Sequence, residues 1–348
     1  MRRPSRRILF FTGILILLVG FLPPGGSSGV TRAQSGAPQA PQNTPPAPPS
    51  QKKKDSDYRI TRDVNLVVLH ATVLDDRGKF VSDLKQEYFR VFEDRVEQKL
   101  SLFKREDIPI SVGLVIDNSG SMAEKRASVN AAALAFVQAS NREDEAFVVN
   151  FNEENYLDLD KDFTNDINEL KEALERIDSR GITALYDAVI ASLDHLKKGT
   201  RDKKVLLVVT DGEDNASRVG GGNKRQGLEL TVIEAQKSDA VIYSIGLLSQ
   251  ERSRETRKSR EALTRLAVAT GGLAFFPEGL GDVGAICTQI AHDIRNQYTL
   301  TYYPTNTKKD GTFRSVNVDV HPPRGRGKLT VRTRTGYFAQ KETAGTGN

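Results

Sequence analysis

Short apolar runs alternate with amphipathic helical patterns through the middle of the chain, from about residue 108 to residue 297. The runs are rich in β-branched residues, which is typical of strands buried on both faces of a parallel sheet. They predict strands at 111–117, 146–151, 205–210, 241–247 and 273–276. The helical periodicity between them predicts helices at 125–139, 167–177, 184–197, 228–237, 260–269 and 283–295. Strict β/α alternation of this kind indicates an α/β fold with a doubly wound, largely parallel sheet.

The pattern changes to a period of two on both sides of this region, which indicates strands with one buried face. The N-terminal flank, 58–107, and the C-terminal flank, 298–338, each contain several such strands. In the second flank, Asp310-Gly311 is a hairpin signal. Neither flank holds enough apolar surface for a core of its own. We therefore predict that the flanks pair into one small β-sandwich, with two separate mini-domains as the alternative.

Oxygen-bearing side chains follow the apolar runs of the central region. Asp117, Ser119 and Ser121 come directly after the first run, Asp211 follows a later one, and Thr183 precedes a predicted helix. Because ligands bind at the carboxyl edge of open α/β sheets, we expect these side chains to gather there. Hard oxygen donors suit Mg²⁺ or Mn²⁺ well, with Ca²⁺ and zinc less favoured. The alternative is that the aspartate and the two serines only cap a helix.

The order Asp117-x-Ser119-x-Ser121, then Thr183, then Asp211 resembles the metal-ion-dependent adhesion site of the von Willebrand factor type A (VWA) domain. The fold of that family is Rossmann-like. The resemblance implies that the two serines and the threonine contact the metal directly or nearly so, while the two aspartates hold it mostly through water. A carboxylate from an Asp or Glu of a partner protein would complete the octahedron. The implied function is an exported, metal-dependent protein-binding module for adhesion or assembly.

The flanks extend the resemblance to bacterial VWA-related proteins, in which the domain lies between β-rich flanks and follows a signal peptide. The resemblance covers roughly 58–338. It is carried by Asp75-x-x-Gly78, Phe89-x-Val91-x-Glu93-Asp94, Tyr302-Tyr303-Pro304, Phe313-Arg314 and Gly336-Tyr337. Arg95 departs from the pattern, because a glycine commonly follows the Glu-Asp pair. This departure puts the tight geometry of that turn in question.

The N-terminus has the layout of a secretory signal peptide. Four arginines precede the apolar stretch 8–22, and small residues follow, so we expect a leader of residues 1–33. A retained membrane anchor is the alternative, although a span needs about 20 apolar residues. Residues 34–57 predict a disordered, Pro-rich linker, and 339–348 a disordered tail. We expect a secreted, periplasmic or cell-envelope protein with no membrane span after the leader is removed.

Charge and cysteine content narrow the candidate functions. The chain carries a net charge of +5 and a pI near 9.1, but residues 1–34 hold five arginines and no acidic residue. Without the leader the chain is neutral, so we expect no nucleic-acid partner. Cys287 is the only cysteine, which excludes an intrachain disulfide and a thiolate metal cluster. Its apolar neighbours predict a small core residue.

A metal-dependent hydrolase or phosphatase that uses the same Asp/Ser cluster is the alternative function. A P-loop is absent, and Ser119 stands where a phosphatase Asp-x-Asp motif needs its second aspartate. Ser119 also lacks the Gly-x-Ser-x-Gly setting of a serine hydrolase, and none of the four histidines lies in a motif. Two-metal hydrolysis needs more acids than Asp117 and Asp211. The sequence therefore favours a binding module over an enzyme, while it identifies neither the partner nor the oligomeric state.

Overall fold

The computed structural model of the protein describes most of the chain between residues 66 and 341. The described ranges are 66–105, 107–153, 155–157, 162–176, 179–248 and 253–341. The predicted leader, the predicted linker and most of the predicted tail lie outside these ranges. No helix within them is long and apolar enough to span a membrane.

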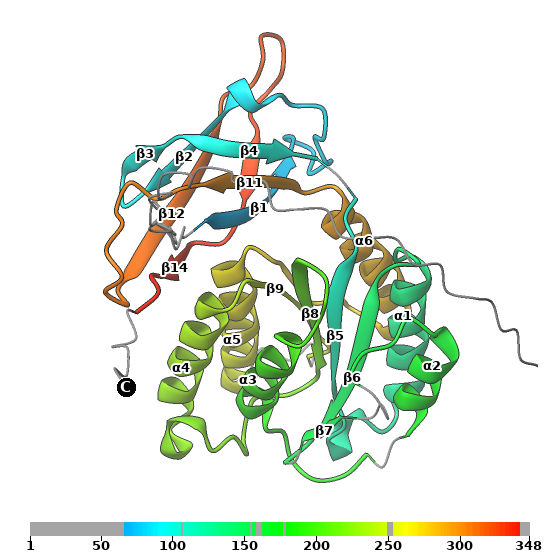
Figure 1. Ribbon diagram of the computed structural model, residues 1–348. Coiled ribbons are helices and arrows are strands. Elements are labelled where there is room, and N and C mark those ends of the chain that lie inside the picture. Colours follow the sequence, from blue (N-terminus) through cyan, green and yellow to red (C-terminus); the bar gives the residue numbers. More distant parts are fainter. Residues whose placement is uncertain are drawn as a thin grey trace, which may run out of the picture. The chain divides into compact units, whose positions relative to one another are not determined.

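The central region folds into a six-stranded sheet in the order β10-β9-β8-β5-β6-β7 (Figure 1). All neighbouring strands are parallel except the edge strand β7, which runs antiparallel to β6. The strands are β5 (Ile110–Asp117), β6 (Glu145–Phe151), β7 (Asn155–Leu157), β8 (Lys203–Thr210), β9 (Ala240–Gly246) and β10 (Ala274–Phe275). The predicted, largely parallel sheet is confirmed.

Helices cover both faces of this sheet. They are α1 (Arg126–Gln138), α2 (Ile167–Glu175), α3 (Leu185–Leu196), α4 (Lys224–Lys237), α5 (Arg254–Thr270) and α6 (Val283–Arg295). Two separate apolar clusters place α1, α2 and α6 on one face and α3, α4 and α5 on the other (Figure 1). The sheet is therefore doubly wound, as predicted. Short 3₁₀ helices occur at η1 (Gln86–Tyr88), η2 (Gly120–Met122), η3 (Val219–Gly222) and η4 (Leu280–Asp282).

Two helices begin earlier than the apolar pattern indicates. The side chain of Asn223 accepts hydrogen bonds from the second and third residues of α4, and Ser253 caps α5 by accepting one from Thr256. The first turns of both helices are polar, so they carry no apolar periodicity. Capping residues, and not apolar spacing, set these two starts.

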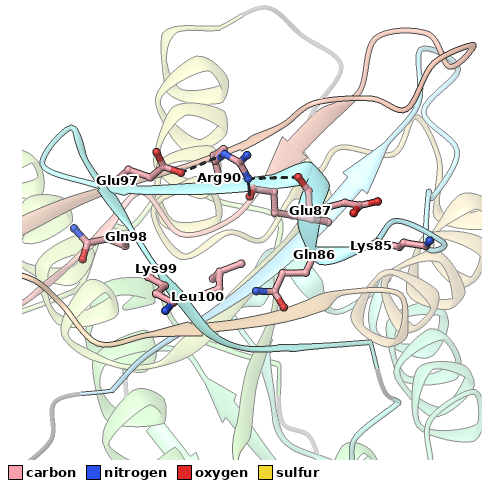
Figure 2. A pocket seen from close by; sticks show the side chains of 9 residues that line it. Lys85, Gln86, Glu87, Arg90, Glu97, Gln98, Lys99 and Leu100 are labelled. Carbon is pink, nitrogen blue, oxygen red and sulfur yellow. Dashed lines mark hydrogen bonds and ion pairs between the residues drawn. The ribbon is translucent and has the colours of Figure 1, made fainter.

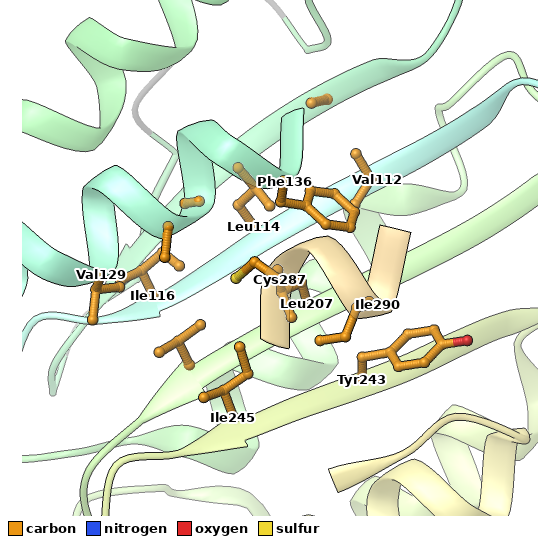
Figure 3. Packing of buried hydrophobic residues seen from close by; sticks show 14 of the residues in the cluster. Val112, Leu114, Ile116, Val129, Phe136, Leu207, Tyr243, Ile245, Cys287 and Ile290 are labelled. Atoms are coloured by element: carbon orange, nitrogen blue, oxygen red, sulfur yellow. The ribbon is translucent and has the colours of Figure 1, made fainter. Parts of the chain in front are cut away.

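Cys287 lies in the apolar core. It belongs to the same cluster of buried side chains as Leu114, Leu207 and Ile290, which Figure 3 shows from close by. Burial raises the pKa of its thiol to about 12. The cysteine is thus an inert core residue, as its apolar neighbours predict.

The two flanks together form a β-sandwich of two four-stranded antiparallel sheets, β13-β1-β11-β4 and β14-β12-β2-β3. Its N-terminal strands are β1 (Val67–Leu74), β2 (Phe89–Glu93), β3 (Val96–Gln98) and β4 (Leu100–Lys104). Its C-terminal strands are β11 (Tyr298–Tyr302), β12 (Phe313–Val320), β13 (Thr330–Arg332) and β14 (Gly336–Phe338). Strands of one flank pair with strands of the other: β1 and β4 with β11, and β2 with β12.

One shared core explains why the flanks combine. Leu69 and Phe89 of the first flank pack in the same buried cluster as Tyr298 and Val318 of the second. The predicted sandwich is confirmed. The hairpin predicted at Asp310-Gly311 is wrong, because β11 and β12 belong to different sheets. That connection crosses between the sheets, and Asp310 forms an isolated bridge with Lys341 instead.

The turn between β2 and β3 keeps its tight geometry without a glycine. Asp94 and Arg95 both adopt positive φ, at 47° and 69°, while Glu93 pairs with Val96 across the turn. The Asp94 side chain accepts hydrogen bonds from the backbone nitrogen and the hydroxyl of Ser315, at 2.9 and 3.0 Å. These bonds stabilise a two-residue turn whose conformation favours glycine at the position of Arg95.

Buried polar side chains hold the C-terminal end of α6. Lys203, only 4% exposed, donates from Nζ to the backbone oxygen of Ile294 at 2.5 Å. Burial lowers the pKa of this lysine to about 7, although the nearby Asp293 carboxylate opposes the shift. Asp293 itself accepts hydrogen bonds from Thr72 of β1 and from the hydroxyl of Tyr243, at 2.8 and 2.9 Å. The helix end is therefore tied to both the central sheet and the sandwich.

Candidate metal-binding site

Asp117, the last residue of β5, lies fully buried at the carboxyl edge of the central sheet. Its Oδ1 accepts a hydrogen bond from the backbone nitrogen of Ser119 at 2.8 Å, and its Oδ2 accepts one from the hydroxyl of Thr210 at 2.5 Å. Burial raises the pKa of the Asp117 carboxyl, and these hydrogen bonds act in the opposite direction. The two donors fix the orientation of the side chain.

The two serines connect this strand end to the end of β8. The hydroxyls of Ser119 and Ser121 lie 3.3 Å apart, and Ser121 Oγ donates to Asp211 Oδ1 at 2.8 Å. Neither η2 nor α1 receives a side-chain capping hydrogen bond. The alternative that these residues only cap a helix is therefore wrong.

Thr183 lies beside the same loop. A methyl group placed on Gly212 would be 3.6 Å from Thr183 Oγ1, so this hydroxyl neighbours the Asp211-Gly212 turn. The backbone nitrogen of Thr183 donates to Asn215 Oδ1 at 2.8 Å, and its carbonyl accepts from the Asn215 nitrogen at 2.9 Å. The structure thus brings all five predicted side chains together at one edge of the sheet.

The loop that follows β8 is fixed to the first turn of α3. The buried Asp214 accepts a hydrogen bond from the backbone nitrogen of Tyr186 at 3.2 Å. In return, the Asp187 carboxylate accepts from the backbone nitrogens of Arg218 and Val219, at 2.8 and 3.0 Å. These reciprocal bonds position Thr183 and Asp211 relative to each other.

Lys125 also reaches the site. It lies directly before α1, and its ammonium group forms an ion pair with Asp211 Oδ2. The Asp211 side chain is only 1% exposed, whereas the Lys125 side chain is 31% exposed. A cation supplied by the chain itself therefore contacts one of the predicted metal-site carboxylates.

Sequence reasoning missed both Lys125 and Thr210. A signal for Thr210 was its place as the one hydroxyl at the end of a buried apolar run, because buried polar groups require a hydrogen-bond partner. Lys125 follows Ser121 by four residues, and nothing in that spacing indicates a contact with Asp211.

The rim beside Asp211 is basic. Glu213, with a side chain 17% exposed, lies 3.5 Å from the Lys224 ammonium and 3.6 Å from the Lys258 ammonium. Both lysines are about half exposed; Lys224 is the first residue of α4, and Lys258 is the fifth residue of α5. An anion approaching the site from this side meets positive charge first.

A hollow of about 730 Å³ lies elsewhere, on the sandwich (Figure 2). Its lining mixes both charges, and Arg90 pairs there with Glu97 at 3.2 Å. None of the five oxygen donors lines it. Figure 2 shows side chains from η1, β2, β3 and the start of β4. No group of three or more His, Cys, Asp or Glu side chains that could hold a metal occurs among the described residues.

Two of the four histidines, His70 and His195, are engaged elsewhere in the fold. His195 stacks on Phe163 with ring centroids 5.5 Å apart, and its Nε2 lies 3.1 Å from the Asp162 carbonyl oxygen. His70 is held in the sandwich, where burial lowers its pKa to about 3. Within the described ranges, Ser119 hydrogen bonds to Ser121 and not to a histidine.

Comparison with known families identifies the central region. Residues 112–213 match the family model described as the von Willebrand factor type A domain. The match includes all five oxygen donors, and the surrounding fold is the doubly wound sheet described above. Residues 112–213 therefore match a von Willebrand factor type A domain, which confirms the resemblance for the central region. No curated protein matches the sequence.

Solved structures that are similar to this chain include the following three. The von Willebrand factor type A protein from Catenulispora acidiphila is 12% identical, with 80% of this chain and 74% of that chain covered and a TM-score of 0.46. The von Willebrand factor domain of the type V pili tip protein Mfa5 from Porphyromonas gingivalis is 14% identical, with 54% and 95% covered and a TM-score of 0.45. The PilB minor pilin from Streptococcus sanguinis is 13% identical, with 56% of this chain covered and a TM-score of 0.45; this chain spans 63% of its length.

Proposed function

We propose that the protein is an exported binding module that recognises an acidic group of a partner protein through a divalent metal ion. The observation that carries this proposal is the convergence of Asp117, Ser119, Ser121, Thr183 and Asp211 at one sheet edge, inside the region that matches the family. The Arg-rich, apolar N-terminus supports export.

The donor set suits a hard divalent cation. No cluster of three or more His, Cys, Asp or Glu side chains occurs among the described residues, so a metal here would depend on hydroxyl oxygens together with two carboxylates. Such oxygen donors match Mg²⁺ or Mn²⁺ and not zinc, which prefers nitrogen and sulfur. The ion pair of Lys125 with Asp211 shows that this carboxylate faces a positive charge.

Each side chain has a defined part in this proposal. Ser119, Ser121 and Thr183 would contact the ion, and Asp117 and Asp211 would hold it through water. A bound Mg²⁺ supplies a positive charge with one coordination position for an outside carboxylate oxygen. Because the direct ligands are neutral hydroxyls, little of that charge is cancelled within the protein. The basic rim adds long-range attraction for an acidic partner, which raises the rate of association.

The alternative, a metal-dependent hydrolase, finds less support. Nucleophilic catalysis by a serine needs a base within hydrogen-bonding distance. The hydroxyls of Ser119 and Ser121 hydrogen bond to each other and to Asp211, and His195 is engaged with Phe163 and the Asp162 carbonyl group. Among the described residues no histidine hydrogen bonds to these hydroxyls, and Asp211, the one carboxylate that Ser121 reaches, is already paired with Lys125.

Titration with Mn²⁺ tests the proposal directly. We expect one site in the wild-type chain, lost in Asp117→Ala and weakened in Thr183→Ala. The matched control is Thr288→Ala, because the Thr288 hydroxyl bonds only within α6, to the Gly284 carbonyl oxygen. Thermal unfolding should show both threonine variants folded. Equal Mn²⁺ affinity in wild type and Asp117→Ala would refute the assignment.

Capture of a binding partner tests the second part of the proposal, which is the recognition of an acidic group through the metal ion. Wild-type protein is incubated with an envelope extract in Mg²⁺ and eluted with chelator, in parallel with Thr183→Ala. Material retained by wild type should be released by chelator and poorly retained by the variant. Capture that survives both treatments would place the interface outside the metal site. Hydrolytic turnover by the pure protein, lost in Asp117→Ala, would favour the enzyme instead.

A further inference from the structure

The ion pair between Lys125 and Asp211 places a positive charge at the position where a metal-site carboxylate would face the ion. Asp211 Oδ1 accepts from Ser121, and Oδ2 takes the lysine ammonium, so both carboxylate oxygens are engaged. The side chain of Asp211 is 1% exposed. A carboxylate at that depth requires a counter-charge, because burial of an unpaired charge is strongly unfavourable.

The placement of Lys125 destabilises the N-terminal end of α1, so its ion pair with Asp211 must provide the compensating interaction. A lysine at the N-terminal end of a helix meets the positive end of the helix dipole. The first turn of α1 contains no acidic residue that would offset this repulsion. The favourable partner of Lys125 is therefore Asp211, which lies 86 positions later in the chain.

The backbone of Lys125 is anchored while its side chain retains freedom. Its backbone nitrogen donates to the Met122 carbonyl oxygen at 2.9 Å, and its own carbonyl accepts from the Val129 nitrogen at 3.1 Å. The side chain is 31% exposed, so the ammonium can exchange the carboxylate for water without unfolding α1. A lysine with four flexible methylenes suits such a movement.

We propose that Lys125 is an internal counter-ion that neutralises Asp211 in the metal-free protein and is displaced when a divalent cation binds. This inference rests on the proposed function. Two cations at one carboxylate repel each other, so the ion binds only by driving the ammonium away. Lys125 thereby keeps the metal-free site folded and lowers the affinity of the site for the ion. The lysine therefore raises the concentration of free metal ion that is needed to occupy the site.

Three variants separate this role from a general effect of positive charge. Lys125→Met removes the charge and keeps the length of the side chain, and Lys125→Arg retains the charge. Lys224→Met is the matched control, since Lys224 lies on the same rim but pairs with Glu213. The probe is Mn²⁺ alone, titrated by calorimetry at constant pH and ionic strength. Thermal unfolding in chelator and in saturating Mn²⁺ is the second readout.

We expect Lys125→Met to bind Mn²⁺ at least tenfold more tightly than wild type, with Lys224→Met within threefold and Lys125→Arg near wild type. In chelator, Lys125→Met should unfold at a lower temperature, and Mn²⁺ should restore it. Equal affinity of Lys125→Met and wild type would overturn this inference and leave the proposed function intact. Absence of Mn²⁺ binding in every protein would overturn both.

Wild-type protein provides a measurement that needs no variant, in case Lys125→Met does not fold without metal. An amine-reactive ester labels free lysines, and mass spectrometry follows the peptide that contains Lys125. Addition of Mg²⁺ should accelerate labelling of Lys125 several-fold and leave Lys171, which is exposed on α2, unchanged. A Lys125 labelling rate that does not respond to Mg²⁺ at a concentration that saturates the site would overturn the inference.

Discussion

Replacement of Lys203 by methionine should change how stability depends on pH. The lysine is 4% exposed at the start of β8, and its ammonium donates to the Ile294 carbonyl oxygen. Burial lowers its pKa from 10.5 to about 7, so the folded protein favours the neutral amine. Methionine fills a similar volume without a charge, and it leaves Ile294 without this donor.

The direction of the effect follows from proton binding. Below pH 7 the lysine is charged in both states, and the folded state bears the full cost of burying that charge. Between pH 7 and pH 10.5 the unfolded chain binds more protons than the folded one, so the free energy of unfolding rises with pH. At about 1.4 kcal/mol for each pH unit of this window, wild type gains up to about 5 kcal/mol. The methionine variant lacks this rise.

Urea unfolding of both proteins near pH 6.5, 8 and 9.5 measures the difference. Near pH 6.5 Lys203→Met should be the more stable protein by a few kcal/mol, after about 1 kcal/mol is subtracted for the lost hydrogen bond. The advantage should shrink as pH rises. Lys171→Met, on the exposed face of α2, is the control and should show no such trend. A stability difference between Lys203→Met and wild type that is constant with pH would refute the reasoning.

Three further outcomes are expected. Arg95→Gly should raise the free energy of unfolding by roughly 0.5–1 kcal/mol, because Arg95 has φ of 69°, a conformation that favours glycine. Arg95→Ala should give no gain, and thermal unfolding of both variants measures the difference. Thr210→Val removes the donor to Asp117 and should cost about 1–3 kcal/mol in urea unfolding and weaken Mn²⁺ binding. A chain that ends at Gln297 lacks the strands that pair with β1 and β2, so limited proteolysis should now cut 67–104; unchanged protection there would show that the first flank folds alone.

The fold could be predicted from the sequence where burial restricts a segment to apolar residues. Strands such as β5 and β8 are buried on both faces, so each reads as a continuous apolar run. The edge strand β7 has three residues and leaves no such pattern. The hairpin prediction at Asp310-Gly311 failed because turn residues indicate that the chain turns, and not which sheet the next strand joins.

The site could be predicted only in part, for a related reason. Asp117, Ser119 and Ser121 lie on one loop, so their spacing is visible in the sequence. Thr210 and Lys125 act through partners 93 and 86 positions away, and only the folded sheet brings each pair together. Local spacing therefore indicated the three oxygen donors of this loop, and the order of the later elements indicated Thr183 and Asp211, while the groups that orient one carboxylate and neutralise another depended on tertiary contacts.

The reciprocal bonds between α3 and the loop after β8 have a consequence for how this domain can diversify. They end at Val219, and the turn that follows contains Gly221 and Gly222, where an added side chain would meet open space. Gly220 is different, because a side chain there would lie 2.5 Å from the Gly227 nitrogen. Extra residues inserted between Gly221 and Gly222 would leave the bonds to Asp187 in place, and they would separate the Asn223 nitrogen from the Gly220 carbonyl oxygen to which it donates. This position is a natural graft point for new recognition loops, whether introduced by evolution or by design.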